Sequence, residues 1–157
     1  RDGQETVVDL RLPDSTFTPG VWMDAPGGLN WTVGLNPNVP LALELEVGAS
    51  RNLIDLFATQ AQEVRLSTGA SATELTLPAR AGTTHAVLKS GAASVEVRVP
   101  DGVSARIRAR AGLASIDVDE SRFPKTGTDS YTSPDFEVAA NRVDLEIETG
   151  VGGVKVR

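Results

Sequence analysis

LALELEVGAS, at residues 41–50, alternates apolar side chains with charged or small ones up to a glycine, and the chain repeats this pattern further on. Similar segments follow at residues 64–78, VRLSTGASATELTLP, and at residues 87–100, VLKSGAASVEVRVP. Alternation with a period of two is typical of β-strands and not of helices. The repeated segment therefore predicts a structure built from similar pairs of strands.

The glycine of each repeat defines the period of the chain. Aligning the repeats on this residue gives five glycines, which are Gly48, Gly69, Gly91, Gly112 and Gly150. Their spacing is about 21 residues, except that the last interval also holds an insertion of about 17, and periods of this size characterise solenoids. We expect these glycines to be structural corners, where the backbone needs either a positive φ or close stacking on the next turn.

Side chains at alternate positions around each glycine are expected to face the core. In the second unit these include Val64, Leu66 and Leu75. The outward positions two and four residues before the glycine tend to alternate in charge from unit to unit, and in chain order they are Glu44/Glu46, Arg65/Ser67, Val87/Lys89, Arg108/Arg110 and Glu146/Glu148. Opposite charges across a strand pair stabilise one register over its alternatives. We therefore expect ladders of opposite charge on the outer face.

These patterns predict one all-β domain, a single β-solenoid with a β-helix-like fold, turns of about 21 residues, an N-terminal cap and one insertion. We assign the N-terminal half-turn and cap to residues 1–40, the repeats to residues 41–120, the insertion to residues 121–140 and the last turn to residues 141–157. The half-turn is placed at residues 7–13, VVDLRLP, which match the second strand of a repeat.

Composition excludes several classes of function. The 157 residues include no cysteine, which removes disulfides, thiol catalysis and cysteine-ligated zinc. With 21 acidic and 15 basic residues the net charge is −6, which argues against nucleic acid as a partner. No apolar run approaches the roughly 18 residues of a spanning helix. Because the chain begins at Arg1, we expect it to be a fragment of a longer protein.

No catalytic, cofactor-binding or metal-binding residue is predicted. His85 is the only histidine of the sequence and falls at an outward position, in line with Glu63, Arg106 and Asp144 of other units, so we expect it to be solvent-exposed beside charged neighbours. Acidic residues could form a glycosidase pair or a calcium site, but their alternation with Arg and Lys favours structural pairing across strands.

The aromatic residues gather in the two segments that interrupt the repeats, and five of them are our candidates for interaction with a partner: Trp22, Trp31, Phe123, Tyr131 and Phe136. Exposed aromatic side chains supply large contact area at interfaces. The structural alternative is that Trp22 and Trp31 belong to a cap over one end of the solenoid, which repeat arrays require. In the same way, the insertion at residues 121–140 could cover the open side of the last turns.

The C-terminal segment SRFPKTGTDSYTSPDFEVAANRVDLEIETGVGGVKVR, residues 121–157, resembles the end of bacterial toastrack domains. The shared segments are, in chain order, GAS at 48–50 and 69–71, VPDGV at 99–103, YTSP at 131–134, ANR at 140–142 and GVGG at 150–153. Such domains occur in LiaF-like, cell wall-active antibiotic response regulators and in related adhesin-like proteins. The resemblance covers roughly residues 30–157 and brings no catalytic motif with it.

The resemblance implies a non-catalytic regulatory or protein-interaction domain of a membrane-associated protein in the cell-envelope stress response. Its partner would be another protein, such as a membrane-bound sensor or regulator, and its location the bacterial cell envelope, with a membrane anchor outside this chain. The alternative is a surface adhesin or glycan-binding module that uses the region of Trp22 and Trp31. An enzyme that cleaves polysaccharides, as some β-helical proteins do, is a third and weaker alternative.

Overall fold

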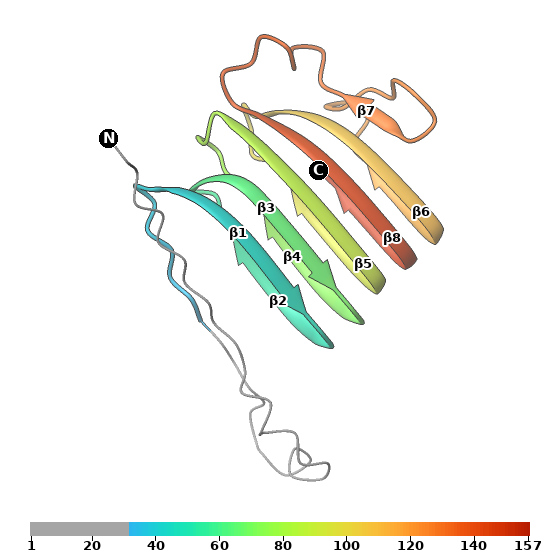
Figure 1. The fold of residues 1–157 in the computed structure, drawn as a ribbon. Helices are drawn as coiled ribbons and strands as arrows, with labels where there is room; N and C mark the ends of the chain where they lie inside the picture. The colour runs from blue at the N-terminus through green and yellow to red at the C-terminus, as the bar shows by residue number, and fades with distance from the viewer. Residues whose placement is uncertain (1–31) are drawn as a thin grey trace. The chain divides into compact units, whose positions relative to one another are not determined.

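The computed structural model describes residues 32–157, of which residues 35–157 form one compact unit (Figure 1). The strands are β1 (Pro40–Val47), β2 (Ser50–Asp55), β3 (Gln60–Thr68), β4 (Ser71–Thr76), β5 (Thr83–Arg98), β6 (Ser104–Val118), β7 (Ser130–Thr132) and β8 (Arg142–Val156). The described part contains no helix, and its sheet is parallel except at β7. The prediction of an all-β solenoid is confirmed. The predicted half-turn at residues 7–13, Trp22 and Trp31 lie outside the described residues.

Each repeat runs along one layer, reverses at its glycine and returns in a second layer. Figure 1 shows this reversal between β1 and β2 and between β3 and β4, whose arrows point in opposite directions. In β5, β6 and β8 the strand continues through the turn, so both layers belong to one folded sheet. Inward-facing side chains of the two layers meet between them and form the core, which includes Leu66, Leu88 and Ile147 from the first layer and Leu75, Val97 and Val156 from the second.

The order of the units in space differs from their order in the chain. Through the first layer the strands follow each other as β1, β3, β5, β8 and β6, so the last unit lies between the third and the fourth. β8 pairs along its length with β5 on one side and with β6 on the other. The backbone N–H and C=O groups of β8 therefore face a neighbouring strand on both sides, so β8 is a central strand of the sheet.

Charge explains why β8 takes this central place. Its outward residues Glu146 and Glu148 face Val87 and Lys89 of β5 on one side and Arg108 and Arg110 of β6 on the other. The Arg108–Glu146 ion pair measures 2.9 Å, and Glu148 lies 3.7 Å from Lys89 and 3.8 Å from Arg110. If β6 lay directly beside β5, Lys89 would be next to Arg110, and like charges across strands are destabilising.

The second layer repeats this arrangement with the signs reversed. There Lys155 of β8 lies between Glu96 of β5 and Asp117 of β6, and its Nζ is 4.0 Å from the Asp117 carboxylate. The acidic first half of β8 thus meets basic neighbours, and its basic second half meets acidic ones. The ladders of opposite charge expected from the sequence are present, and they are completed by the exchange in strand order.

The repeat glycines stack on one another at the turns. None of the five has a positive φ, so close stacking, and not an unusual backbone conformation, is what requires them. A Cβ atom added at Gly150 would lie 2.8 Å from the Gly91 carbonyl oxygen, and one at Gly112 would lie 2.9 Å from that of Gly150. At Gly69 and Gly91 the nearest carbonyl oxygen is 3.4 Å away, which is tight but close to ordinary contact.

Gly152, just after the turn in β8, is under the strongest constraint. Its φ is +125°, and an added Cβ would lie 2.0 Å from the Ala93 carbonyl oxygen of β5. We expect Gly152→Ala to lower the free energy of unfolding by more than about 2 kcal/mol, because it combines backbone strain with a clash against main-chain atoms. Gly48→Ala is the matched control, since an added Cβ there meets nothing within 4 Å. Denaturant unfolding of both variants measures the difference, and equal midpoints would contradict the stacking described.

Reversing charges across β6 and β8 tests the strand order. Changing Arg108 and Arg110 to Glu should lower stability by about 1 kcal/mol, because exposed pairs contribute roughly 0.2–1 kcal/mol each. Adding Glu146→Arg and Glu148→Arg should recover only part of the loss, since the second substitution places a positive charge opposite Lys89 of β5. Denaturant unfolding at low and high salt measures this coupling, which salt should weaken. Strictly additive effects would mean that β6 and β8 are not neighbours.

Candidate functional site

A strap formed by residues 119–141 covers part of β6 at one end of the stack. Its strand β7 pairs in antiparallel fashion with Arg106–Arg108, and the Asp129 carbonyl accepts a hydrogen bond from the Ala109 amide at 2.9 Å. Phe123, Tyr131 and Phe136 of the strap are 1%, 8% and 6% exposed. These three interaction candidates therefore pack inside the domain and do not present the surface that an interface anchor needs, which matches the covering role considered for the insertion.

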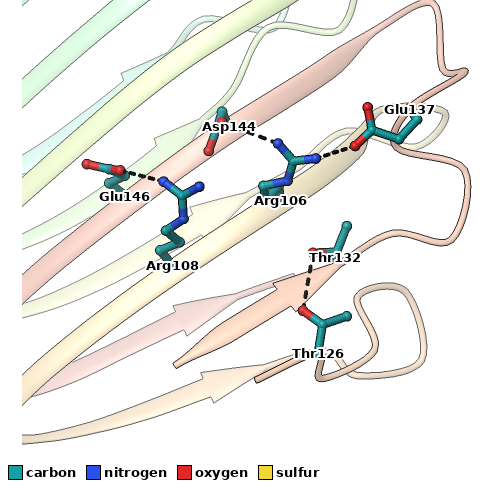
Figure 2. Close-up of polar contacts among 7 residues, drawn as sticks. All are labelled: Arg106, Arg108, Thr126, Thr132, Glu137, Asp144 and Glu146. Carbon is teal, nitrogen blue, oxygen red and sulfur yellow. Dashed lines mark hydrogen bonds and ion pairs between the residues drawn. The ribbon is translucent and has the colours of Figure 1, made fainter. Parts of the chain in front are cut away.

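Arg106 is held between the strap and the sheet (Figure 2). Its guanidinium stacks over the Phe136 ring, 4.2 Å from the ring centre, and makes an ion pair with Glu137 of the strap. A second carboxylate, that of Asp144 in β8, lies 3.9 Å away. Two acidic groups thus neutralise this arginine, and its role is to fasten the strap to the sheet.

The start of the strap is fastened by a tight turn. The Ser121 hydroxyl and amide both donate to Asp119 Oδ1, at 2.6 and 3.1 Å, and these hydrogen bonds, with the side-chain one first, lower the pKa of the Asp119 carboxyl below its usual value. Arg122 then donates to the carbonyl oxygens of Val99 and Pro100, at 2.8 and 3.1 Å. The strap is therefore tied to the loop between β5 and β6 as well as to β6 itself.

The burial of Phe136 gives a direct test of the strap. We expect Phe136→Ala to lower the free energy of unfolding by about 3 kcal/mol, as truncation of a buried aromatic side chain does. Val138, 85% exposed on the same strap, provides the control, and Val138→Ala should leave stability within about 0.5 kcal/mol of wild type. Thermal and denaturant unfolding report both values. A Phe136→Ala protein as stable as wild type would show that the strap is not packed as described.

His85 lies on the outer face, where the sequence places it. Its neighbours across the sheet are Glu63 of β3 and Asp144 of β8, while Arg106 follows one strand further on. The side chain is exposed, as expected. Among residues 32–157 no three potential metal-ligating side chains come together.

A shallow, open groove of about 990 Å³ runs along the stacked turns. It is lined by the five repeat glycines and by the two residues that precede each of them. The residues two positions before the glycines are, in spatial order, Glu46, Ser67, Lys89, Glu148 and Arg110, and charge alternates over the last three. The groove exists because every unit has glycine at the same point, so no side chain rises from the turn itself.

The opposite side of the glycines carries an apolar column. The residue after each glycine is exposed, and in spatial order these residues are Ala49, Ala70, Ala92, Val151 and Leu113. Val151 is 52% and Leu113 85% exposed. We call the groove and this column together the glycine edge. It crosses all five units, so at roughly 4.8 Å between neighbouring strands it is about 20 Å long.

Sequence reasoning identified the glycines of this edge as corners and did not treat them as part of a surface. The signal was present, because a small or apolar residue follows each repeat glycine while a charged or hydroxyl-bearing residue stands two positions before it. The aromatic residues of the two interrupting segments were predicted as interaction candidates instead. Polar groups along the edge also contact one another, as when Ser90 Oγ donates to Thr149 Oγ1 at 2.8 Å.

An open, parallel β-solenoid with a glycine-lined edge defines a structural class, and comparisons place the chain within it. The family model described as the N-terminal domain of toast_rack, DUF2154, matches residues 2–98. The chain belongs to this toast_rack family, which confirms the resemblance found in the sequence. No curated protein matched the sequence.

A solved structure shares the fold. It is that of a proposed cell adhesion protein from Clostridium sporogenes ATCC 15579, with a TM-score of 0.72 and 20% sequence identity. The match covers 83% of this chain and 66% of that one, so the present chain spans about two thirds of its relative. In the part of the chain that the structure describes, no helix is long and apolar enough to span a membrane.

Proposed function

We propose that this chain is a non-catalytic interaction domain of a bacterial cell-envelope protein, and that it binds its partner through the glycine edge. The observation that carries the proposal is the combination of exposed apolar side chains and a charged border along one flat edge of the stack. Protein interfaces commonly have an apolar centre surrounded by a polar rim. Val151 and Leu113, both more than half exposed, supply the largest apolar side chains of this edge, and they lie at one end of it beside the charged residues of the groove.

The rigidity of the scaffold supports the same proposal. The glycine edge is built on paired strands, and its neighbouring units are fixed by hydrogen bonds such as those from the Gly69 amide to the Val47 carbonyl, 2.9 Å, and from the Ala92 amide to the Gly69 carbonyl, 3.2 Å. A surface of this kind loses little conformational entropy when a partner binds, and pre-organisation of this kind favours affinity.

The finer proposal follows from the family resemblance. We propose that the partner is another protein, a membrane-bound sensor or regulator, and that the domain acts in the envelope stress response while a segment outside this chain links it to the membrane. The alternative is a surface adhesin or glycan-binding module. The structural relative with a proposed cell-adhesion role favours this alternative.

The experiment compares two exposed valines. Val151→Arg alters the glycine edge, whereas Val138→Arg makes the same change on the strap, outside the groove. Each variant and the wild type are immobilised and exposed to detergent-solubilised bacterial envelope and, separately, to purified cell-wall glycan. We expect the wild type and Val138→Arg to retain a membrane protein, which mass spectrometry identifies. Val151→Arg should retain at least tenfold less of it, as expected for a change at a buried interface residue.

Each other outcome has a definite reading. Retention of purified glycan by the wild type, lost in Val151→Arg, favours the adhesin alternative. Equal binding by all three proteins would show that the partner does not use the glycine edge. Cleavage of the glycan by the wild-type chain would contradict a non-catalytic role.

A further inference from the structure

Within residues 32–157, the outer edge of β6 has no neighbouring strand along half of its length. β7 pairs with Arg106–Arg108, and the Asp129 carbonyl accepts from Ala109. From Arg110 to Val118, no strand of the described part of the chain pairs with this edge. The unpaired stretch reads RAGLASIDV. It forms the open end of the second layer and of the turn.

This free edge lacks the features that usually prevent pairing with another chain. Natural edge strands carry proline, bulges, inward-pointing charges or a covering segment. Residues 111–116 contain no charge and no proline, and Leu113 is 85% exposed. The core-facing Ile116 is only half-buried here, whereas its counterpart Val154 in β8 is 2% exposed. Both hydrogen-bonding groups and apolar surface are therefore open at this end.

The free edge of β6 at residues 110–117, RAGLASID, is complementary to a second copy of itself that runs in the opposite direction. We propose that two copies of the chain associate through this edge, with residues 110–117 of one copy antiparallel to residues 110–117 of the other. The two-fold register pairs Arg110 with Asp117, Ala111 with Ile116, Gly112 with Ser115 and Leu113 with Ala114. Arg110 and Asp117 both point outward, whereas Ala111 and Ile116 lie on the inner side of the strand, as their buried partners Thr149 and Val154 in β8 do. At this free edge Ala111 is exposed and Ile116 half-buried. Opposite charges meet at both ends of the paired segment, and apolar side chains meet inside it.

The course of β6 through its turn makes this symmetry feasible. A two-fold axis passing through the turn exchanges the two layers, so that the first layer of one copy meets the second layer of the other with strands antiparallel. β7 and Asp129 occupy the edge only as far as Ala109, so no strand within residues 32–157 pairs with these eight residues on their outer side. Such an interface is self-complementary and closes as a dimer.

Stacking of β6 on the first unit of a second copy is a competing arrangement and fits less well. Continuing the register of the stack would place Arg110 beside Glu46, which is favourable, but Asp117 beside Leu53, which gains no opposite charge. That arrangement also has no closure and would extend into a fibre. The two-fold pairing satisfies both charged ends at once. It does not rest on the function proposed for the glycine edge.

The test uses the whole chain and two single charge reversals. In Arg110→Asp both ends of the paired segment bring Asp against Asp, and in Asp117→Arg they bring Arg against Arg. Each variant alone should dimerise at least about tenfold more weakly than wild type, because like charges directly opposite are destabilising. An equal mixture of the two should dimerise again, since each end then pairs Asp with Arg. Sedimentation equilibrium over a concentration series measures all four samples.

Control variants separate this effect from altered folding. Arg110 and Asp117 each make one long intramolecular contact, of 3.8 Å to Glu148 and 4.0 Å to Lys155. Arg65→Asp and Glu74→Arg remove similar exposed contacts away from the free edge and should dimerise as the wild type does. Circular dichroism confirms the fold of every variant.

The outcomes decide the proposal in either direction. Dimers of the wild type that are weakened in each single variant and restored in the mixture support it. A wild type that stays monomeric at roughly 1 mM overturns it, since an interface too weak to form there would not be specific. Assemblies larger than a dimer, sensitive to Arg110→Asp but not to Asp117→Arg, overturn it in favour of end-to-end stacking. Loss of dimerisation that the mixture does not restore overturns the two-fold register.

Discussion

The arrangement of the domain depends on the pairing of β8 with two strands at once. Its first half carries Glu146 and Glu148 between the basic side chains of β5 and β6, and its second half carries Lys155 between Glu96 and Asp117. No single ion pair here is strong, because exposed pairs contribute little individually. Their combined effect is to make one order of strands better than its alternatives, whereas the core-facing residues are apolar in every unit and distinguish the units less. Outward charge thus supplies the specificity, and the apolar layers supply the stability.

The glycine turns impose the second constraint, and they link the fold to its candidate surface. Strands of neighbouring units can approach at the turn only if no side chain separates the carbonyl of one unit from the Cα of the next, as the distances at Gly150 and Gly112 show. The same requirement leaves a groove without side chains at its centre, bordered by charge on one side and by an apolar column on the other. The surface proposed for partner binding is therefore a by-product of how the solenoid turns.

Much of the fold could be predicted from the sequence, because the period of two and the recurring glycine are local signals. Val64, Leu66 and Leu75 face the core as their positions required. The spatial order of units could not be deduced in this way, since parallel pairing between distant strands leaves no local signature. One indication existed: the alternation of charge fails in chain order between Lys89 and Arg110, which is where β8 is inserted.

The candidate site was less predictable. Phe123, Tyr131 and Phe136 stand out in a chain with few aromatic residues, but the sequence cannot distinguish an aromatic group that covers a core from one that awaits a partner. The sequence of the insertion is compatible with both roles, covering the core and binding a partner. The packing of the strap against β6 decides for the covering role. The glycine edge, in contrast, consists of residues too ordinary to attract notice singly, and it becomes a surface only when five units are stacked.

The central place of β8 also bears on how the chain folds during synthesis. The ribosome completes β6 before β8 exists, so for a time β5 and β6 both have unpaired edges, and a nascent solenoid could close by joining them directly. Like charge at Lys89 and Arg110 disfavours this direct pairing of β5 with β6. β8, which is made after β5 and β6, must then enter between two strands that are already present, and contacts so distant in sequence form slowly. The part of the domain formed by β5, β8 and β6 would then become native only after β8 has left the ribosome, and not when the earlier repeats have been made.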